Sequence, residues 1–246
     1  MALFLREAVF RLSRGRAAWM WLLLEPIIHI VTMILIFTII RMRTVGGIEL
    51  AVWLVAGLLP FFMFKRSGTQ AKNAIDANQN IFVYRQIKPV DTVLVRAGLE
   101  GFLTILVAMI LTVGLYFYGV DIIPDDPLAV LAATFGLWLM GLGFGLVCSV
   151  LIKLISESDK LINLAMMPLY MISGVIFPIT SVPQPYRDWL LFNPLAHGVE
   201  ASRLGMSSYY HAFPELDLGY LYKFALASIF LGLALHNRFE RKLVMK

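Results

Sequence analysis

The sequence predicts an all-α polytopic membrane protein with six transmembrane helices, and three observations lead to this fold class. Of the 246 residues, 59% are hydrophobic and only 15% are charged, with a mean hydropathy of +0.78. A soluble domain carries roughly 25% charged residues and does not bury such an apolar excess. The apolar residues gather into runs of about 20, the length that a helix needs to cross a bilayer core. The single cysteine, Cys148, excludes a disulfide framework or a cysteine-based metal centre.

The hydropathy pattern predicts a single transmembrane domain over residues 1–246, with six spans. They are expected at about 19–40, 50–70, 98–120, 127–152, 161–180 and 216–236. The fourth span is dotted with glycine and the fifth contains Pro168. The first apolar run is too long for the core of a cleaved signal peptide and lacks a small-residue cleavage site, so we expect it to be retained.

The distribution of basic residues predicts the orientation of the spans. Most of the 21 Lys and Arg residues lie before the first span, between the second and third, between the fourth and fifth, or after the sixth. Because basic residues accumulate on the cytoplasmic side, both termini are expected to be cytoplasmic. The formal net charge of +5 is therefore attributed to membrane topology, and no nucleic-acid partner is expected.

An amphipathic helix is predicted over residues 1–17, ahead of the first span. Leu5, Ala8, Val9 and Leu12 follow the i, i+3, i+4, i+7 spacing of one apolar stripe, with Glu7 on the opposite face. This pattern is typical of a helix lying in the headgroup plane of the membrane, with its basic residues facing anionic lipid. The alternative is a plain basic flank that only sets the topology.

A large cytoplasmic segment is expected between the second and third spans. Ser67 is expected to cap a helix there, and Pro89 suits the first turn of the following helix. Ile81 and Phe82 lie among amide side chains, and exposed apolar residues with a polar rim indicate a docking surface. The alternative is a loop that packs on its own bundle.

The outer segment 180–215 is neither a clean span nor a hydrophilic loop. The apolar run that contains Trp189 is too short to cross a bilayer, which favours a re-entrant or interfacial arrangement. Irregular backbone at membrane depth is tolerated only inside protein or along a cavity. The segment is therefore a candidate pore element, and the alternative is an aromatic belt that anchors a surface loop.

The sequence lacks most motifs that carry chemistry. There is no phosphate-binding loop of the G-x-x-x-x-G-K-[ST] type, so we expect no ATP hydrolysis by this chain. No cluster of His, Cys, Asp and Glu has metal-ligand spacing, and no catalytic residues are predicted. Glu25 and His29 lie four residues apart in the first span, where ionisable residues are functional candidates. They suit a proton relay, or Glu25 simply bonds a neighbouring helix near the membrane surface.

Several stretches, in order along nearly the whole chain, resemble the inner-membrane permeases of ABC-type capsular polysaccharide exporters, the type-two ABC export permeases. The glycine-rich fourth span fits as well. The matching stretches are Leu24-Glu25-Pro26, Asn73–Asn80, Ile87–Asp91, Ser173–Pro178 and Asn193-Pro194-Leu195, with Pro183, Trp189, Glu200 and Arg203 around the last two.

The resemblance implies a homodimer in the bacterial inner membrane, with each copy bound to a separate ATP-binding cassette subunit. ATP and Mg²⁺ would belong to that subunit, and this chain would carry no cofactor. Residues 71–90 would form the coupling segment that docks on the ATPase. Its implied contact residues are Asn73, Asp76, Asn78, Asn80, Phe82, Tyr84 and Arg85.

The implied substrate is a capsular polysaccharide, often acidic and lipid-linked, moved from cytoplasm to periplasm through a channel between the two copies. Membrane lipid, and periplasmic or outer-membrane export proteins, are further expected partners. A glycan channel needs aromatic faces and weak multi-site binding. The channel or substrate candidates are Trp19, Trp21, Glu25, His29, Arg41, Arg43, Tyr186, Arg187, Trp189, Glu200, Arg203 and Tyr209.

Three other functions stay open on the sequence. An ABC permease of this kind could carry a drug or a small lipid in place of a glycan. A proton-coupled carrier would use Glu25 and His29, although such carriers usually contain paired repeats, and the two halves of this chain show no self-similarity. A membrane-embedded transferase would need a convergent acid, base or metal set that the sequence lacks.

Overall fold

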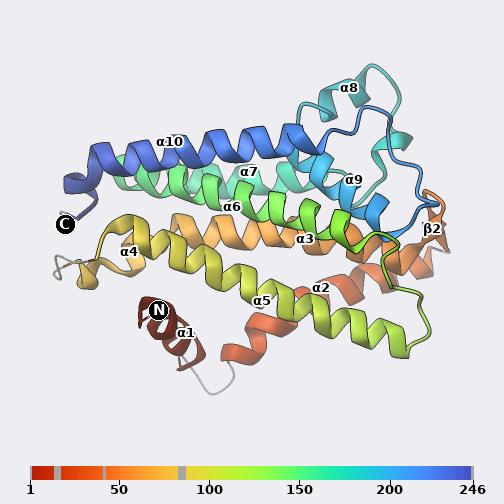
Figure 1. Ribbon diagram of the computed structural model, residues 1–246, viewed down its shortest axis with the longest axis horizontal. Helices are drawn as coiled ribbons and strands as arrows, with labels where there is room; N and C mark the ends of the chain where they lie inside the picture. The colour runs from red at the N-terminus through yellow and green to blue at the C-terminus, as the bar shows by residue number, and fades with distance from the viewer. Residues whose placement is uncertain (1, 14–17, 41–42, 83–86, 245–246) are drawn as a thin grey trace.

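The computed structural model is a bundle of long helices with short elements at both ends (Figure 1). It describes residues 2–13, 18–40, 43–82 and 87–244. The α-helices are α1 (Ala2–Ser13), α2 (Ala18–Ile39), α3 (Leu50–Lys72), α4 (Ala74–Ala77), α5 (Pro89–Phe117), α6 (Pro127–Leu154), α7 (Ser158–Ile172), α8 (Tyr186–Leu190), α9 (Pro194–Met206) and α10 (Leu218–Val244). Two 3₁₀ turns, η1 (Gln79–Ile81) and η2 (Ile179–Ser181), and a hairpin of β1 (Thr44–Val45) and β2 (Ile48–Glu49) complete the described elements.

Five helices in the described part of the chain are long and apolar enough to cross a membrane. They are α2 from Met20 onward, α3, α5, α6 and α10. This confirms an all-α polytopic membrane protein, but the count of six spans is not confirmed. The helix expected over 161–180 is α7, which ends at Ile172. Gly174 follows with φ of +70°, a left-handed residue typical of a helix C-terminus.

Helices α3 and α6 form the centre of the bundle. Helix α6 packs on α3 along one side and on α10 along the other. In its most apolar stretch α3 is 83% buried, whereas α2 is only 11% buried and α10 only 17%. The outer faces of α2 and α10 therefore need lipid or another chain to cover them, because their exposed residues are apolar.

Glycines on α6 explain how closely these helices approach. A Cβ atom on Gly143 would lie 2.1 Å from Ser228 Oγ and 2.9 Å from the backbone nitrogen of Ile229, both on α10. A Cβ atom on Gly145 would lie 2.3 Å from the Cβ of Ala71 on α3. Small residues at such contacts let membrane helices pack through their backbones. The glycine-rich run of the sequence is thus a packing surface.

One end of the bundle carries α4 and the C-terminus, with α1 beside it (Figure 1). Helix α1 leaves Leu5 and Val9 exposed on its outward face, and Glu7 is buried against α5. Two residues of the stripe predicted from the sequence, Leu5 and Val9, therefore face away from the bundle, as an interfacial helix requires. The expectation that Ser67 caps a helix was wrong, because α3 runs without a break to Lys72.

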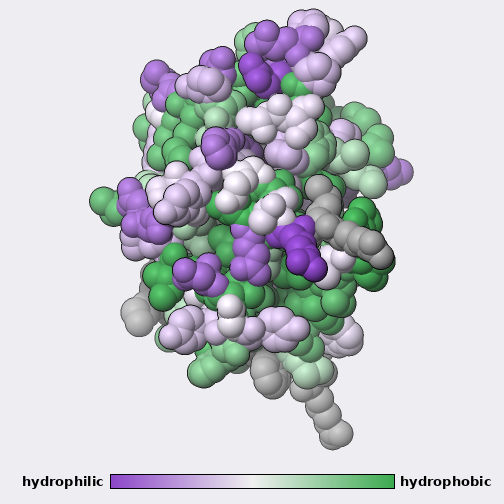
Figure 2. Space-filling view, turned by 90° about the vertical axis from the view of Figure 1, so that its right-hand side faces the viewer, coloured by the Kyte–Doolittle hydropathy of each residue, from purple (hydrophilic) through white to green (hydrophobic). Residues whose placement is uncertain are grey.

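The other end of the bundle carries the hairpin, α8 and α9 (Figure 1). Gly46 and Gly47, with φ of 60° and 94°, make the turn between β1 and β2. Nearly all of α9 is buried, whereas α8 contains no buried residue. Seen from this end, hydrophilic residues gather over the upper and central part of the surface, between hydrophobic ones (Figure 2).

Candidate functional site

Helices α2, α3 and α7 line a cavity of about 130 Å³ that brings together acidic, basic, imidazole and phenol side chains. We call it the polar cleft. It continues along α2 into an open groove that Trp21, Glu25 and His29 help to line. The polar cleft is lined by Glu25, Pro26, His29, Phe62, Lys65, Arg66 and Tyr170.

His29 joins two helices across the polar cleft. Its Nε2 lies 3.3 Å from the hydroxyl oxygen of Tyr170 on α7. Its ring also makes an edge contact with Phe62 on α3, with the ring centroids 5.3 Å apart. Tyr170 in turn packs on Phe61 at 5.1 Å. The wall of the cleft is therefore aromatic, with an imidazole and a phenol as its polar tips.

The charges of the polar cleft differ in how strongly they are held. Arg66 donates from Nε to Glu100 over 3.1 Å and from Nη1 to the Leu22 carbonyl over 2.9 Å. Lys65 and Glu25 are exposed, and neither has an ion-pair partner among the residues that the structure describes. The cleft thus offers one loosely held cation and one anion beside aromatic faces, which suits weak contacts with a polar chain that slides past.

Glu200 and Arg203, predicted as channel residues, form a buried cluster near the other end of the bundle. Arg203 donates from Nη1 to Glu200 Oε1 over 2.7 Å, and its guanidinium lies 3.8 Å from the ring centroid of Trp53. It also donates to the carbonyls of Gly174 and Val175 over 2.7 and 3.0 Å. Both charged side chains have no exposed surface, so in this conformation neither can contact a substrate.

Tyr210 completes this cluster from the loop after α9. Its hydroxyl donates to Glu200 Oε2 over 2.7 Å. Burial, and next the nearby Glu200 carboxylate, raise the pKa of Tyr210, so its proton stays available for that bond. The cluster ties α9 to α3 and to the turn after α7. Its role in this structure is to hold the backbone at the end of α7.

The remaining channel candidates do not converge. Tyr186 and Trp189 lie exposed on α8, in an edge contact with ring centroids 5.6 Å apart, and Arg187 lies between them in sequence. Arg43 and Tyr209 are exposed near the hairpin end. Arg41 and the side chain of Trp19 lie outside the described residues. Of the candidates whose side chains the structure describes, Glu25 and His29 line the polar cleft, and Trp21 joins them in the adjoining groove.

Segment 71–90 lies at the end of the bundle that carries the C-terminus (Figure 1). Asn73, Asp76 and Asn80 are exposed there. Asn78 is buried and donates to the Ala74 carbonyl over 3.0 Å, which makes it a structural residue of α4. Tyr84 lies outside the described residues, and so does Arg85. Within the described part of this segment, a partner can therefore reach the exposed side chains of Asn73, Asp76 and Asn80.

The expectation that Ile81 and Phe82 face the cytoplasm was wrong. Both are buried, with 6% and 7% of their surfaces exposed. Phe82 packs in a small core with Ala74 and Ile75 of α4 and Val93 of α5. The alternative of a loop that packs on its own bundle thus holds for these two side chains, because burial of a phenylalanine on its own helices removes a large apolar area from water.

Ion pairs connect segment 71–90 to its neighbours. Asp76 on α4 pairs with Lys153 near the end of α6, with Lys153 Nζ 3.2 Å from Oδ1. Lys72, almost fully buried, pairs with Asp159 at the start of α7. Helix α7 also carries Tyr170 of the polar cleft. Because Lys72 is the last residue of α3 and lies just before α4, this pair links the start of segment 71–90 to the helix that forms one wall of the cleft.

Sequence reasoning selected Glu25 and His29 as site candidates but none of the other residues that line the polar cleft. Phe62, Lys65 and Tyr170 were treated as parts of ordinary spans or flanks. Lys65 carried one usable signal, because it directly follows the apolar run of α3. Tyr170 carried none, since its neighbour His29 lies 141 residues away in the chain.

Comparisons with known proteins were made over the whole chain. Residues 1–207 match the family described as ABC-2 type transporter. The chain is 36% identical over 243 residues to the polysialic acid transport protein KpsM of Escherichia coli, covering 99% of this chain and 94% of that protein. It is 27% identical to the capsule polysaccharide export inner-membrane protein CtrC of Neisseria meningitidis serogroup A, and 24% identical to BexB of Haemophilus influenzae. Each of these two alignments covers 98% of this chain and 90% of the relative.

Proposed function

The chain belongs to the ABC-2 type transporter family, and from this premise we propose that it is the membrane subunit of an ATP-driven exporter of capsular polysaccharide. The direction of transport is from cytoplasm to periplasm across the bacterial inner membrane. Of the relatives that align over nearly their whole length, KpsM is named a polysialic acid transport protein, and CtrC and BexB are named capsule polysaccharide export inner-membrane proteins. The alternative cargoes, a drug or a small lipid, find no such support.

The polar cleft is the observation that carries the proposal on the structural side. Sugar rings pack on aromatic faces such as Phe62 and Tyr170, and their hydroxyls exchange hydrogen bonds with groups such as His29 and Glu25. Lys65 supplies a cation for acidic sugars without a competing ion pair in the described part of the chain. These contacts are individually weak, which a chain in transit requires.

In this proposal the energy for transport comes from a separate ATPase subunit that binds at segment 71–90. The complete transporter contains two copies of each subunit, and both termini of this chain lie in the cytoplasm. The sequence lacks a phosphate-binding loop, so in an ATP-driven exporter a separate subunit would bind and hydrolyse the ATP. The exposed Asn73, Asp76 and Asn80 offer the polar contact surface. Movement at the start of segment 71–90 would reach α7 through the pair of Asp159 with Lys72, the last residue of α3.

The test is export by the two subunits reconstituted together in proteoliposomes, with lipid-linked capsular glycan supplied on the ATPase side. We expect ATP-dependent appearance of glycan on the other side. Tyr170→Ala and Lys65→Gln should reduce export several-fold while the ATPase subunit still binds. Leu164→Ala, an exposed apolar change on the same helix, is the matched control. Export that is unchanged in both cleft variants would contradict the assignment of the polar cleft.

A proton-coupled carrier is the second candidate, because Glu25 and His29 line the same cleft. It predicts transport driven by a pH gradient without ATP, and loss of that transport in Glu25→Gln. Transport that needs ATP and persists in Glu25→Gln favours the exporter.

A further inference from the structure

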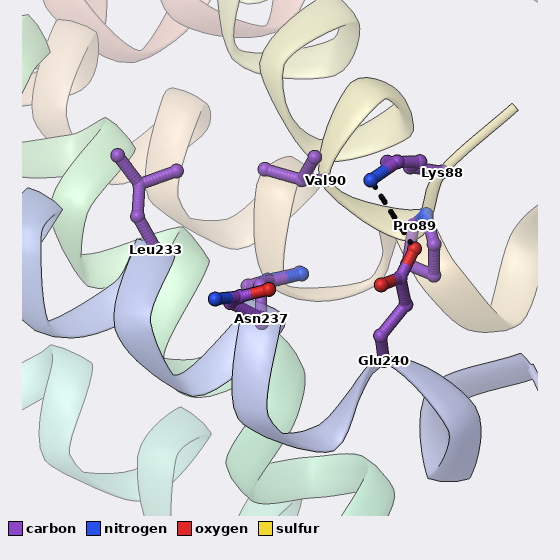
Figure 3. Close-up of a pocket in the computed structure, with 7 residues that line it drawn as sticks. Lys88, Pro89, Val90, Leu233, Asn237 and Glu240 are labelled. Carbon is purple, nitrogen blue, oxygen red and sulfur yellow. Dashed lines mark ion pairs between the residues drawn. The ribbon is translucent and has the colours of Figure 1, made fainter.

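A second pocket lies where the start of α5 meets the last turns of α10, at the same end of the bundle as α4 (Figure 3). Its volume is about 110 Å³, several times what a single water molecule needs. Lys88 and Pro89, at the end of segment 71–90, form one wall. The opposite wall belongs to α10 and consists of Leu233, His236, Asn237 and Glu240.

The hydrogen bonds of His236 determine what this pocket can bind. Ser149 Oγ donates its only proton to the Leu146 carbonyl over 2.9 Å. The same oxygen lies 3.0 Å from His236 Nε2, so it accepts, and Nε2 carries the proton of the neutral ring. The other nitrogen, Nδ1, is then a lone-pair acceptor. It is buried and has no hydrogen-bond partner among the residues that the structure describes.

The rim adds further acceptors. The Glu240 carboxylate reaches across the pocket to Lys88, with Oε1 3.5 Å from Nζ (Figure 3). These two side chains are 42% and 64% exposed, so the pair is weak and easily exchanged for another cation. Asn237 presents its amide beside Glu240 (Figure 3). The pocket therefore combines a buried acceptor with an exposed carboxylate, and an incoming hydrogen-bond donor satisfies both.

We propose that this pocket is a second docking point for the ATPase subunit and that it receives a basic side chain, best an arginine. This rests on the proposed function. A guanidinium presents several N–H donors in a planar fork, so one group can meet His236 Nδ1 and replace Lys88 as the partner of Glu240. The pocket is continuous with segment 71–90 through Lys88, which places both contacts on one face of the bundle.

The test measures the affinity of the purified ATPase subunit for the full chain in nanodiscs. Glu240→Gln removes the carboxylate, and His236→Gln removes the Nδ1 acceptor while its amide can still donate to Ser149. Loss of one charge-assisted hydrogen bond predicts affinity about tenfold weaker or more for each variant. Arg238→Gln, an exposed change on α10 outside the pocket, should bind as the unchanged chain does. Thermal midpoints of all variants show whether the fold is intact.

Unchanged affinity in folded Glu240→Gln and His236→Gln would overturn the second docking point, while the unchanged chain still binds the ATPase. Absence of binding by the unchanged chain would instead count against the proposed function. A photo-crosslinking residue at position 237 identifies the occupant. Crosslinks to an ATPase peptide that contains a basic residue support the proposal. Crosslinks only to lipid or to a second copy of this chain contradict it.

Discussion

Arg96 of α5 holds Glu7 of α1 in an ion pair, with Nε and Oε1 2.7 Å apart and each side chain only 8% exposed. The same guanidinium lies 3.4 Å from the Asn73 carbonyl, at the start of α4, through Nη1. A helix that the sequence places at the membrane surface is thus linked through one side chain to the segment that we assign to ATPase docking.

Glu7→Ala should release α1 from the bundle. Removal of one partner of a buried ion pair costs about 3–5 kcal/mol, and here the loss falls on the contact between α1 and α5. Hydrogen exchange should show faster exchange of α1 amides, with the protection of α6 unchanged. Arg6→Ala, an exposed change beside it, should leave that exchange slow. Equal protection of α1 in Glu7→Ala and the unchanged chain would show that the pair does not hold this helix.

Arg203→Met should destabilise the whole bundle, because it leaves Glu200 as an unpaired buried charge and removes the donor to two carbonyls. The expected cost is about 3–5 kcal/mol, visible as a lower thermal midpoint in detergent. The double variant Glu200→Gln with Arg203→Met should lose less than the single one. Leu204→Ala, exposed on the same helix, is the control. A midpoint in Arg203→Met equal to that of the control would refute this structural role.

The hydrogen bonds of Asp125 predict that the stability of the fold depends on pH. The backbone N–H and the hydroxyl of Ser208 donate to its carboxylate over 2.7 and 2.9 Å and lower the pKa of Asp125. Because the folded pKa lies below the unfolded one, the stabilisation is present above the unfolded pKa and is lost as pH falls through the folded pKa. Thermal midpoints of Asp125→Asn and the unchanged chain should differ at pH 6 and converge in acid. Asp121→Asn, an exposed change in the same loop, should show no such convergence.

Replacement by alanine should have opposite effects on the stability of the fold at two glycines, Gly143 and Gly114. Gly143→Ala puts a methyl group against Ser228 and the backbone of α10, and overpacking of this kind costs about 1–3 kcal/mol. Gly114→Ala on α5 meets nothing within 4 Å. It should stabilise by about 0.5–1 kcal/mol through helix propensity alone. Urea unfolding in mild detergent separates the two, and similar effects at both positions would argue against close packing of α6 on α10.

Hydropathy alone locates the helices that are long enough to cross the membrane, because insertion depends on the summed transfer free energy of a contiguous run. It places the end of the fifth expected span too late, because hydropathy follows only the apolar run. The apolar residues continue past Ile172, but Gly174 turns the backbone there and Arg203 binds the carbonyls that follow. The end of α7 is thus a tertiary feature, as is the burial of α9.

Some residues of the candidate site could be predicted from the sequence, and others could not. Glu25 and His29 could be selected from the sequence, since two ionisable residues on one face of an apolar helix stand out locally. Tyr170 and the pocket around His236 could not, because their partners lie on other helices. Which side chains meet depends on how helices pack, and Phe82 shows that a residue with a surface pattern can be buried by its neighbours. The sequence alone determined the membrane class, the five long apolar helices and the family. Tertiary packing decided which polar groups share a cavity, because those contacts join segments that no local pattern connects.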